Sequence, residues 1–243
     1  MAVKTLSIVI PVYNEEKRIV QTIRQVIAAN SLELTKEIII IDDGSKDGTV
    51  KQVKDFLREI KRDTKYIVRL IENKINKGKG AVVKQAFLQT KGDIVLVQDA
   101  DLEYSPEDYP VLLQPFFHYG ADVVFGSRFI SDRPHRVLYF WHSVGNKFLT
   151  CFSNIFTNLN LTDMETGAKV FKGNLIRSIA PQLLSKRFGF EPEITARISK
   201  IAAIKIYEVG ISYAGRTYLE GKKIKLIDGI KAIGEILYFN NLR

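Results

Sequence analysis

The chain has 243 residues, of which 46% are hydrophobic and 26% are charged, and its formal net charge is +9 at pH 7. This is the composition of an ordinary globular protein without a low-complexity tract, and the length suits one large domain or two small ones. The single cysteine, Cys151, excludes a disulfide framework. The three histidines are far apart in the sequence, which argues against a Cys/His zinc site.

Apolar strands and helices alternate through the first half of the sequence. The expected strands cover residues 6–13, 37–45, 66–73, 93–101 and 121–128. The expected helices between them cover residues 15–29, 49–60 and 80–90, and a fourth begins at Pro106 with Ser105 as its N-cap. Strands that are nearly all apolar and are separated by helices predict an α/β fold with a parallel sheet covered on both faces.

The second half of the sequence is more helical. We expect a long aromatic-rich helix over residues 138–158, a helix near 191–202, a strand over 206–216, and a final amphipathic helix ending at Phe239. No internal repeat or linker is visible. The simplest interpretation is a single domain over residues 1–243, composed of a first half (1–127) and an appended second half (128–243).

The excess of positive over negative charge lies entirely in the second half. Residues 1–127 contain 18 Lys/Arg and 18 Asp/Glu, whereas residues 128–243 contain 18 Lys/Arg and 9 Asp/Glu, which accounts for the whole excess of +9. One interpretation is a solvated basic surface. The other is that this half faces an anion, such as a nucleic acid, a phosphorylated substrate or an anionic membrane.

Three carboxylates follow the fourth expected strand at every second position. They are Asp99, Asp101 and Glu103. Alternate residues of an extended chain point the same way, so the three side chains would converge and repel one another unless a cation lies among them. Hard divalent cations such as Mg²⁺ and Mn²⁺ favour such oxygen ligands and often keep substrate phosphates as further ligands. Alternatively, these acids begin the next helix, as Glu107 and Asp108 do.

Polar motifs also follow the other expected strands, and parallel sheets bind ligands beyond the carboxyl ends of their strands. Other phosphate-binding and catalytic motifs are excluded. The chain has no P-loop, and the segment NKGKGAVVK fails as a dinucleotide fingerprint because its third glycine position is Val83. The segment DDGSKDGT fails as an EF-hand because Lys54 occupies the twelfth position, and no G-x-S-x-G motif supports a hydrolase.

The order and spacing of these motifs resemble the family 2 glycosyltransferases of GT-A fold. The motifs are SIVIPVYNEE, IIIIDDGSKDGT, NKGKG, DIVLVQDADLE and FGSR. Later segments resemble the polyprenyl-phosphate hexosyltransferases, the dolichol-phosphate mannose synthase group, and these are LTDMETGAKVF, RFGFEPEITARI and YEVGISYAGRTYLEGKKI. The resemblance extends from about Leu6 to Leu237. It implies that residues 1–127 bind a nucleotide sugar and that residues 128–243 bind the acceptor.

The resemblance also implies which residues bind the donor. The nucleotide-sugar-binding residues would be Pro11, Val12, Tyr13, Glu15, Asp43, Lys79, Asp99, Ala100 and Asp101. Asp43 would accept a hydrogen bond from the base, whereas Lys79 is either a base or phosphate contact or a solvated lysine. Asp101 would ligate Mg²⁺ or Mn²⁺ directly and Asp99 would lie beside it. Glu103 would complete the metal shell, at a position where the family often has glutamine.

On the acceptor side, the resemblance implies basic contacts to phosphate. These are Arg128, Arg136, Arg216 and Lys222, with one of Arg133, His135 or Arg136 as the additional contact, and the catalytic set is Asp101, Arg128, Arg216 and Lys222. A phosphomonoester has a second pKa near ~6, so it is already ionised at neutral pH and needs no protein base. Asp163 and Glu165 lie in the sugar-side motif. Glu191 and Glu193 either position the sugar or nearby arginines, or are helix N-terminal acids.

The sequence bears on membrane attachment as well. The N-terminal apolar run breaks at Pro11, unlike a signal peptide, and no segment approaches the ~20 apolar residues of a membrane span. A stripe on the last helix either packs on its own domain or lies on a membrane, and it consists of Leu226, Ile227, Ile230, Ile233 and Leu237. We expect a cytoplasmic protein, attached peripherally at the cytoplasmic membrane face.

The expected function is metal-dependent, inverting transfer of a hexose from a nucleotide diphosphate sugar to polyprenyl phosphate. GDP-mannose and UDP-glucose both remain compatible as the donor, and the sequence leaves the oligomeric state open. One alternative is a family 2 transferase with a saccharide hydroxyl acceptor, which would need Asp163 or Glu191 as a base. Another is a non-catalytic module that binds nucleotides or nucleic acid through the basic half; the predicted partners of the enzyme itself include no nucleic acid.

Overall fold

The computed structural model describes residues 3–60, 65–130, 135–137, 139–187, 189–217 and 226–241. Its described strands are β1 (Thr5–Val12), β2 (Thr35–Asp42), β3 (Tyr66–Glu72), β4 (Ile94–Val97), β5 (Val123–Ser127), β6 (Lys169–Lys172) and β7 (Ile206–Gly210). Its described helices are α1 (Ile19–Ala28), α2 (Thr49–Glu59), α3 (Lys79–Phe87), α4 (Tyr109–His118), α5 (Phe140–Thr157), α6 (Gly173–Ile179), α7 (Phe190–Ser199) and α8 (Leu226–Asn241).

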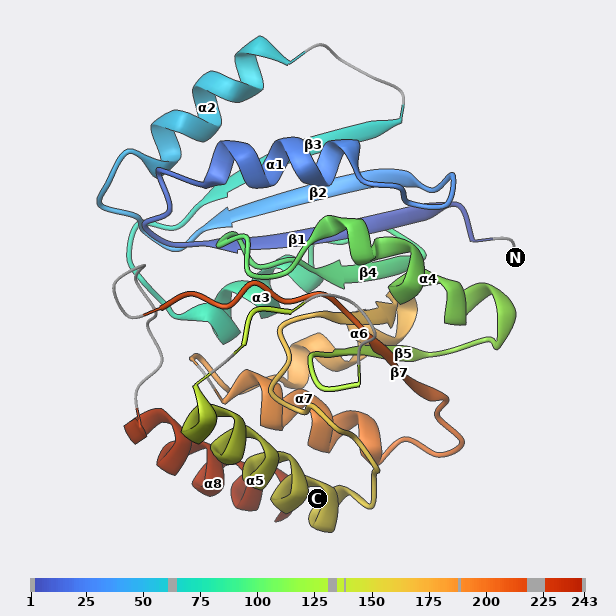
Figure 1. Cartoon of the computed structure of the whole chain (residues 1–243). Coiled ribbons are helices and arrows are strands. Elements are labelled where there is room, and N and C mark those ends of the chain that lie inside the picture. The colour runs from blue at the N-terminus through green and yellow to red at the C-terminus, as the bar shows by residue number, and fades with distance from the viewer. Residues whose placement is uncertain are drawn as a thin grey trace.

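The strands form one sheet in the order β3-β2-β1-β4-β6-β5-β7, with helices on both of its faces (Figure 1). The pairs β3-β2, β2-β1, β1-β4 and β5-β7 are parallel. Strand β6 is antiparallel to both of its neighbours, β4 and β5. The expected α/β architecture with a mostly parallel sheet is therefore confirmed.

Each face of the sheet has its own hydrophobic core, because successive side chains of a strand point to opposite faces. Ile8 and Ile10 of β1 belong to the first core, where α1, α2 and α4 pack, whereas Val9 belongs to the second. The second core is covered by α3, α6 and α7 and includes Ile236 of α8. This double burial explains why the strand sequences are almost uninterrupted runs of apolar residues.

The structure corrects the expectation for residues 93–101. Strand β4 ends at Val97, and the chain then turns, with Leu102 in the left-handed region at a φ of 63°. Asp99, Asp101 and Glu103 are therefore not alternate residues of an extended strand. The prediction from strand periodicity was wrong, because the chain leaves the sheet after Val97 and folds into a turn.

Strand β6 was not predicted from the sequence. Its first three residues end the segment LTDMETGAKVF, for which the sequence predicted no strand, and Lys172 follows that segment. A run of four residues is too short to show a hydrophobic period. The pairing partners of β6 are distant in the chain, so neighbouring residues do not reveal the strand either. The expected strand over 206–216 is likewise shorter, since β7 ends at Gly210.

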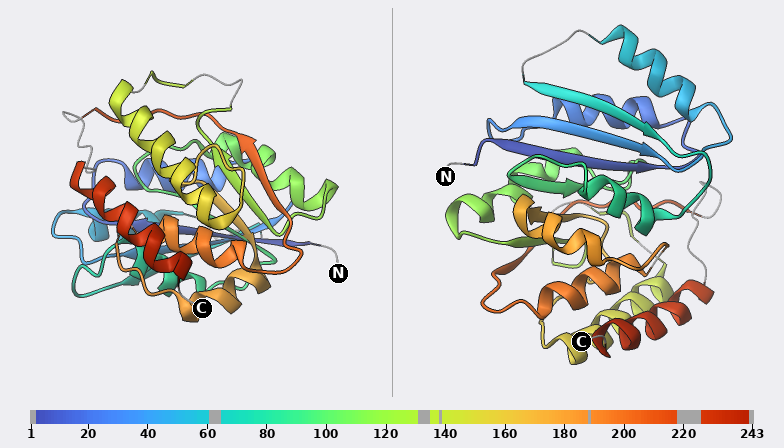
Figure 2. Two further views of the ribbon diagram at one scale, coloured as in Figure 1. Left: turned by 90° about the horizontal axis from the view of Figure 1, so that it is seen from below. Right: turned by 180° about the vertical axis from the view of Figure 1, so that it is seen from behind.

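The helical expectations for the second half are largely confirmed. The long helix expected over 138–158 is α5, and the helix expected near 191–202 is α7. Helices α5 and α8 lie side by side in both views of Figure 2, at the end of the molecule away from β3. Ser105 Oγ accepts a hydrogen bond from the Glu107 amide at 3.2 Å, so the predicted cap is present, on a short 3₁₀ turn (Pro106–Asp108) that precedes α4.

Phe171 of β6 tests the energetic importance of this unpredicted strand. Its side chain is fully buried and packs edge-on against Phe87 at 5.8 Å between ring centroids. We expect Phe171→Ala to lower the free energy of unfolding by about 3–5 kcal/mol, because it removes a buried ring and leaves a cavity. Urea denaturation measures this change. Ile67→Ala, at a side chain that is 61% exposed, should change the value by less than about 0.5 kcal/mol.

Candidate active site

The site lies beyond the carboxyl ends of the parallel strands β1, β2 and β4, where the loops that follow them meet. Those ends are adjacent because the three strands are neighbours in the sheet. Two loops from the second half join them, residues 161–168 before β6 and residues 211–217 after β7. Segments more than 100 residues apart in the chain thereby contribute charged side chains to one place.

Arg216 connects three acids of the first half. Its Nη2 donates to Asp101 Oδ2 at 2.7 Å, and its Nε donates to Glu103 Oε1 at 2.9 Å. Its Nη1 lies 3.4 Å from Glu15 Oε1. Glu15 follows β1 and the other two acids follow β4. One guanidinium therefore holds together the loops after three strands, because burial of several carboxylates requires a cation among them.

Asp101 lies in a strongly negative environment despite this pairing. The pKa of its carboxyl is raised to about 7, chiefly by burial and also by repulsion from Asp99 and Glu103. Arg216 opposes this shift. The pKa of Arg216 itself is raised by its acidic neighbours, Asp101 foremost, against the effect of burial. Within the described residues, no group of three His, Cys, Asp or Glu side chains is arranged to hold a metal ion.

Lys79 neutralises a second pair of acids. Its ammonium group lies 3.1 Å from Asp99 Oδ1 and 3.1 Å from Glu191 Oε1. Burial alone would lower the pKa of Lys79, but the two carboxylates raise it well above its usual value. Lys79 is therefore an ion-paired member of the site and not a solvated lysine. The pairing also fixes the first turn of α7, which carries Glu191, to the loop after β4.

Asp163 and Arg128 form the most buried ion pair of the site. Arg128 Nε and Nη2 donate to Asp163 Oδ2 and Oδ1 at 2.6 Å and 2.7 Å, and Asn146 of α5 donates to Oδ1 at 3.0 Å. The side chain of Asp163 is fully buried, and that of Arg128 is 13% exposed. Two parallel N–H···O bonds fix the guanidinium plane, so Arg128 is held in one orientation.

Tyr213 links the three described arginines that the sequence had placed at the acceptor. The guanidinium of Arg128 lies over its ring at 5.2 Å from the centroid. Its hydroxyl donates to Glu103 Oε2 at 2.6 Å, and Glu103 in turn accepts from Arg216. Its carbonyl accepts the backbone amide of Arg136 at 2.8 Å. Arg128 therefore contacts the Tyr213 ring directly, and Arg216 is joined to Tyr213 through Glu103. Arg136 is joined to the backbone of Tyr213, and its guanidinium donates to the Gly215 carbonyl at 3.0 Å.

The loop of residues 161–168 is tightly held. Glu208 of β7 accepts the amides of Thr162 and Asp163 at 3.0 Å and 3.1 Å, and Tyr104 accepts the amide of Gly167 at 2.9 Å. A Cβ on Gly167 would lie 2.5 Å from Asp99 Oδ2, so only glycine allows the loop to approach this acid. The loop consequently touches the Arg128 pair at one end and Asp99 at the other.

The expected base-binding side of the site is formed by the ends of β1 and β2. Pro11 and Val12 end β1, and Tyr13 follows it. Asp43 accepts the amides of Lys77 and Gly78 at 2.7 Å and 2.8 Å, so its carboxylate fixes the NKGKG loop. Its role toward a base is untested and stays a prediction. Ala100, also expected at the donor, is buried in the turn after β4.

Three further expected residues remain to be accounted for. Lys222 and Arg133 fall outside the described residues. Glu193 points away from Lys79, because it accepts the amides of Leu184 and Ser185 and pairs with Arg197 at 2.8 Å. Glu193 thus lies in the first turn of α7 and orders a nearby arginine, Arg197, and both of these interpretations agree with its contacts.

Sequence analysis missed Tyr104, Tyr213, Asn146 and Glu208. Each acts by holding a charged or backbone group of the site in place. Glu208 had a usable signal, since it is a carboxylate within the otherwise uncharged segment IYEVG. Asn146 had a weaker one, as a polar residue in an aromatic-rich helix. The two tyrosines carried no signal that separates them from ordinary core aromatics.

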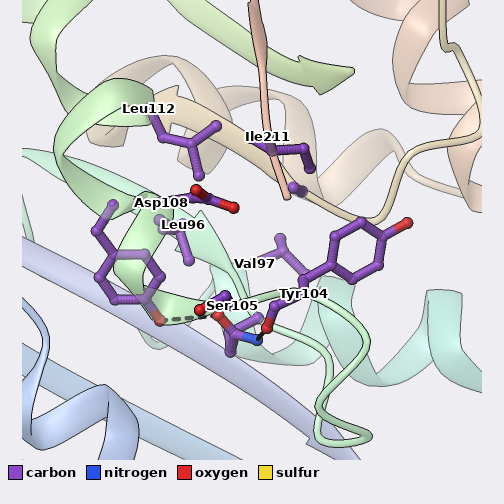
Figure 3. Close-up of a pocket in the computed structure, with 10 residues that line it drawn as sticks. Leu96, Val97, Tyr104, Ser105, Asp108, Leu112 and Ile211 are labelled. Atoms are coloured by element: carbon purple, nitrogen blue, oxygen red, sulfur yellow. Dashed lines mark hydrogen bonds between the residues drawn. The ribbon is translucent and has the colours of Figure 1, made fainter. Parts of the chain in front are cut away.

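A small cavity lies behind the site, between β4, α4 and the chain after β7 (Figure 3). Its volume is about 10 Å³, which is about the space of one water molecule. Tyr109 donates to Gln98 Oε1 at 3.0 Å in its wall, and Asp108 accepts from Ser212. None of the ion-paired residues above lines it, so it is a gap in the packing and not the place of a substrate.

Comparison with known proteins agrees with this site and fold. The family model described as Glycosyl transferase family 2 matches residues 7–175. The chain is 28% identical over 248 residues to UDP-N-acetylglucosamine–dolichyl-phosphate N-acetylglucosaminyltransferase of Methanococcus voltae, covering 98% of this chain and 96% of the relative. It is 30% identical over 232 residues to dolichyl-phosphate beta-glucosyltransferase of Dictyostelium discoideum, covering 90% and 68%.

A solved structure shares the fold. It is glucosyl-3-phosphoglycerate synthase from Mycobacterium tuberculosis in complex with Mn²⁺, UDP-glucose and phosphoglyceric acid, with a TM-score of 0.74 at 18% identity, covering 99% of this chain and 81% of that one. The fold is therefore GT-A. The chain belongs to glycosyl transferase family 2, and it is a glycosyltransferase.

The buried Arg128–Asp163 pair generates a stability prediction. We expect Asp163→Asn to lower the free energy of unfolding by about 3–5 kcal/mol, because it leaves the guanidinium without a charged partner in a buried place. Asp55→Asn is the matched control, since Asp55 pairs with Arg58 at 3.0 Å where the side chains are 44% and 77% exposed. Its effect should stay below about 0.5 kcal/mol. Equal losses in urea denaturation would contradict the assignment.

Proposed function

We propose that the protein transfers a hexosyl group, with inversion, from a nucleotide diphosphate sugar to the phosphate of a polyprenyl phosphate. The names of the two relatives support the acceptor class, since both are dolichyl-phosphate transferases. The donor side is formed by the ends of β1, β2 and β4, and the acceptor side by the arginines around Tyr213. GDP-mannose and UDP-glucose both stand as donors within this proposal.

One observation carries the choice of acceptor: both carboxylates suited to act as a base are already ion-paired. Asp163 accepts two hydrogen bonds from Arg128, and Glu191 pairs with Lys79. A saccharide hydroxyl must lose a proton to a base, which these groups are poorly placed to accept. A phosphomonoester with a second pKa near ~6 already carries its attacking oxyanion at neutral pH. The site therefore favours a phosphate acceptor.

In this mechanism the protein brings two anions together and disperses the charge on the leaving diphosphate. Arg128 is pre-oriented by Asp163, and Glu103 fixes Arg216. The Arg136 guanidinium donates to the Gly215 carbonyl, so the acceptor phosphate would meet guanidinium groups held in place. Lys222 belongs to this proposed set. Planar guanidinium groups suit such contacts because they form paired hydrogen bonds to phosphate oxygens.

A divalent cation, Mg²⁺ or Mn²⁺, forms part of the proposal. The oxygen ligands present fit it, because Asp99 and Asp101 offer hard carboxylate oxygens. Burial is the main cause of the raised pKa of Asp101, and repulsion from Asp99 and Glu103 adds to it, so Arg216 does not fully offset the negative charge there. Glu103 was expected as a third ligand, but its two oxygens accept hydrogen bonds from Tyr213 and Arg216. When bound, the cation would neutralise the leaving diphosphate. Solved neighbours carry Mn²⁺ or Mg²⁺ with UDP.

Asp101→Asn tests the donor half of this proposal. We expect transfer of a labelled hexose from UDP-glucose or GDP-mannose to a short polyprenyl phosphate, with Mn²⁺ present, to fall at least about 100-fold. Radioactivity in the lipid phase measures it. Glu107→Gln, an exposed acid six residues later, is the control and should retain activity. Full activity in Asp101→Asn would refute the proposed role of this carboxylate, and transfer only to free oligosaccharides would refute the phosphate acceptor.

We also propose that α5 and α8 attach the protein to a bilayer. Among the described residues, no helix is long and apolar enough to cross a membrane. Helix α5 instead turns polar side chains inward, since its buried residues are Thr150, Ser153 and Thr157. Its outward stripe is apolar, with Trp141 78% and Ile155 71% exposed. A lipid acceptor and an excess of positive charge in the same half favour an anionic membrane as the partner.

Helix α8 contributes to the same end of the molecule with two apolar faces. Ala232, Ile236 and Phe239 are buried against the domain, whereas Ile230 and Leu237 of the expected stripe are exposed. Part of the expectation for this stripe concerned Leu226 and Ile227, whose side chains fall outside the described residues. The packed face secures α8 to α5 and α7, and the outer face is available to lipid.

A double variant, Phe140→Ala with Trp141→Ala, tests membrane attachment. We expect its binding to vesicles of mixed zwitterionic and anionic phospholipid to weaken by about 100-fold, because two large aromatic side chains no longer enter the interface. Co-sedimentation measures the partition coefficient. Ile67→Ala, at a similarly exposed side chain on the opposite sheet edge, should bind as the parent does. Unchanged binding, together with loss of a concentration-dependent dimer, would instead assign the stripe to a second copy.

A further inference from the structure

Two acids among the described residues have a buried carboxylate oxygen without a hydrogen-bond partner, Asp42 and Glu165. Asp42 ends β2 and its other oxygen accepts the amides of Gly44 and Ser45, whereas Glu165 lies on the loop between the two sides of the site. Among the described residues, four buried side-chain atoms lack a hydrogen-bond partner, and Glu165 Oε1 is the one that lies in the charged cluster beside Asp163, Glu191 and Lys169. Leaving a buried acceptor unsatisfied costs about 1–3 kcal/mol. A group that remains so in a tightly packed site calls for a functional explanation.

The neighbours of Glu165 are all engaged with other groups. Asp163 accepts from Arg128, and Glu191 pairs with Lys79. The ammonium group of Lys169 donates to the carbonyl oxygens of Met164 and Thr166, the first at 2.9 Å. A change of rotamer at these residues would break existing bonds. The protein itself therefore offers Glu165 Oε1 no ready partner, which leaves a ligand as the natural one.

The position of Glu165 identifies which part of a ligand it would meet. Two residues before it, Asp163 holds Arg128 on the acceptor side, and two residues after it, Gly167 touches Asp99 on the donor side. In direct transfer, the sugar ring lies between the leaving diphosphate and the attacking phosphate. The loop that carries Glu165 spans those same two sides, and its backbone is fixed by Glu208 and Tyr104.

The protonation of Glu165 suits a sugar better than a phosphate. Burial raises the pKa of its carboxyl, repulsion from Glu191 adds to this shift, and Lys169 opposes it. The raised pKa favours the neutral acid. A neutral carboxyl group both donates and accepts a hydrogen bond, as a sugar hydroxyl does. A phosphate oxygen would meet Asp163 and Glu191 close by, and it already has arginines to bind.

We propose that Glu165 is a specificity-determining residue, whose carboxyl group hydrogen bonds a hydroxyl substituent of the donor's hexosyl ring. This inference rests on the proposed function for the identity of the donor. It concerns discrimination between sugars that share one nucleotide, because the nucleotide contacts lie at the ends of β1 and β2. A site that bonds a hydroxyl rejects an analogue without it, since the buried partner is then left unsatisfied.

Binding of donors and their analogues tests this role without any acceptor. Calorimetry with Mn²⁺ would compare UDP with UDP-glucose and GDP with GDP-mannose, followed by the monodeoxy forms of the tighter sugar nucleotide. For the parent protein, we expect one deoxy form to bind about 10–100-fold more weakly than the full sugar nucleotide. In Glu165→Leu, the affinity for the full sugar nucleotide should fall by that same factor. The affinity for the deoxy form should stay close to its value in the parent protein. The nucleoside diphosphate alone should bind within about 2-fold of the parent.

Two further variants separate recognition from folding. Glu165→Gln keeps a donor and an acceptor in the same shape and should retain most of the discrimination. Asn240→Leu removes another buried, unpartnered oxygen, from a half-buried side chain in the last turn of α8, and should leave the discrimination unchanged. An equal loss for the nucleoside diphosphate and every sugar form in Glu165→Leu would overturn the proposal as a structural effect, and so would unchanged discrimination.

Failure of the proposed function gives a different pattern. If the sugar nucleotides bind with the expected discrimination but no hexose reaches polyprenyl phosphate, the assignment of Glu165 stands and the acceptor is wrong. If neither sugar nucleotide binds more tightly than its nucleoside diphosphate, the protein gains nothing from the sugar ring, and the role of Glu165 is refuted. If no nucleotide binds at all, both proposals fail.

Discussion

The ion pairs of Arg216 are the interaction on which the arrangement of the site depends. A single guanidinium joins Glu15 after β1 and Asp101 and Glu103 after β4 to the segment that follows β7. Without this cation, several buried carboxylates would face one another in a medium of low polarity, which is strongly unfavourable. A basic residue of the second half therefore balances a local concentration of acid from the first half. The net charge of +9 is the excess that remains after such pairs cancel.

The same compensation recurs in the rest of the site. Lys79 satisfies Asp99 and Glu191, and Arg128 satisfies Asp163. Each pair links elements distant in the chain, so the charges fix loops that carry few apolar contacts of their own. This agrees with a site that handles two phosphorylated substrates, because preorganised charges need little rearrangement when the substrates arrive. Glu165 departs from this pattern of pairing, because its buried Oε1 has no hydrogen-bond partner.

Much of the fold could be predicted because its signals are local. A few neighbouring residues are enough to indicate an apolar strand, an amphipathic helix or the cap at Ser105, and the structure confirms these features. Strand β6 is four residues long and is defined by distant partners, so no window reveals it. The acids after β4 were predicted to converge because alternate residues of a strand point the same way, but they lie in a turn. Their partners, Arg216 and Lys79, followed from the family resemblance, whereas Tyr213 and Glu208 depend on tertiary packing that one sequence does not display.

The antiparallel strand inside the sheet has a consequence for how the chain folds during synthesis. Strand β5 has no sheet neighbour among the residues that precede it, since its partners are β6 and β7. While the ribosome delivers the first 127 residues, β1 to β4 can assemble in order, but β4 keeps an open edge until residue 169 emerges. An exposed edge in a nascent chain is a template for wrong pairing. The part of the sheet formed by the first 127 residues thus stays incomplete, and in need of protection, until translation has passed the loop that carries Glu165.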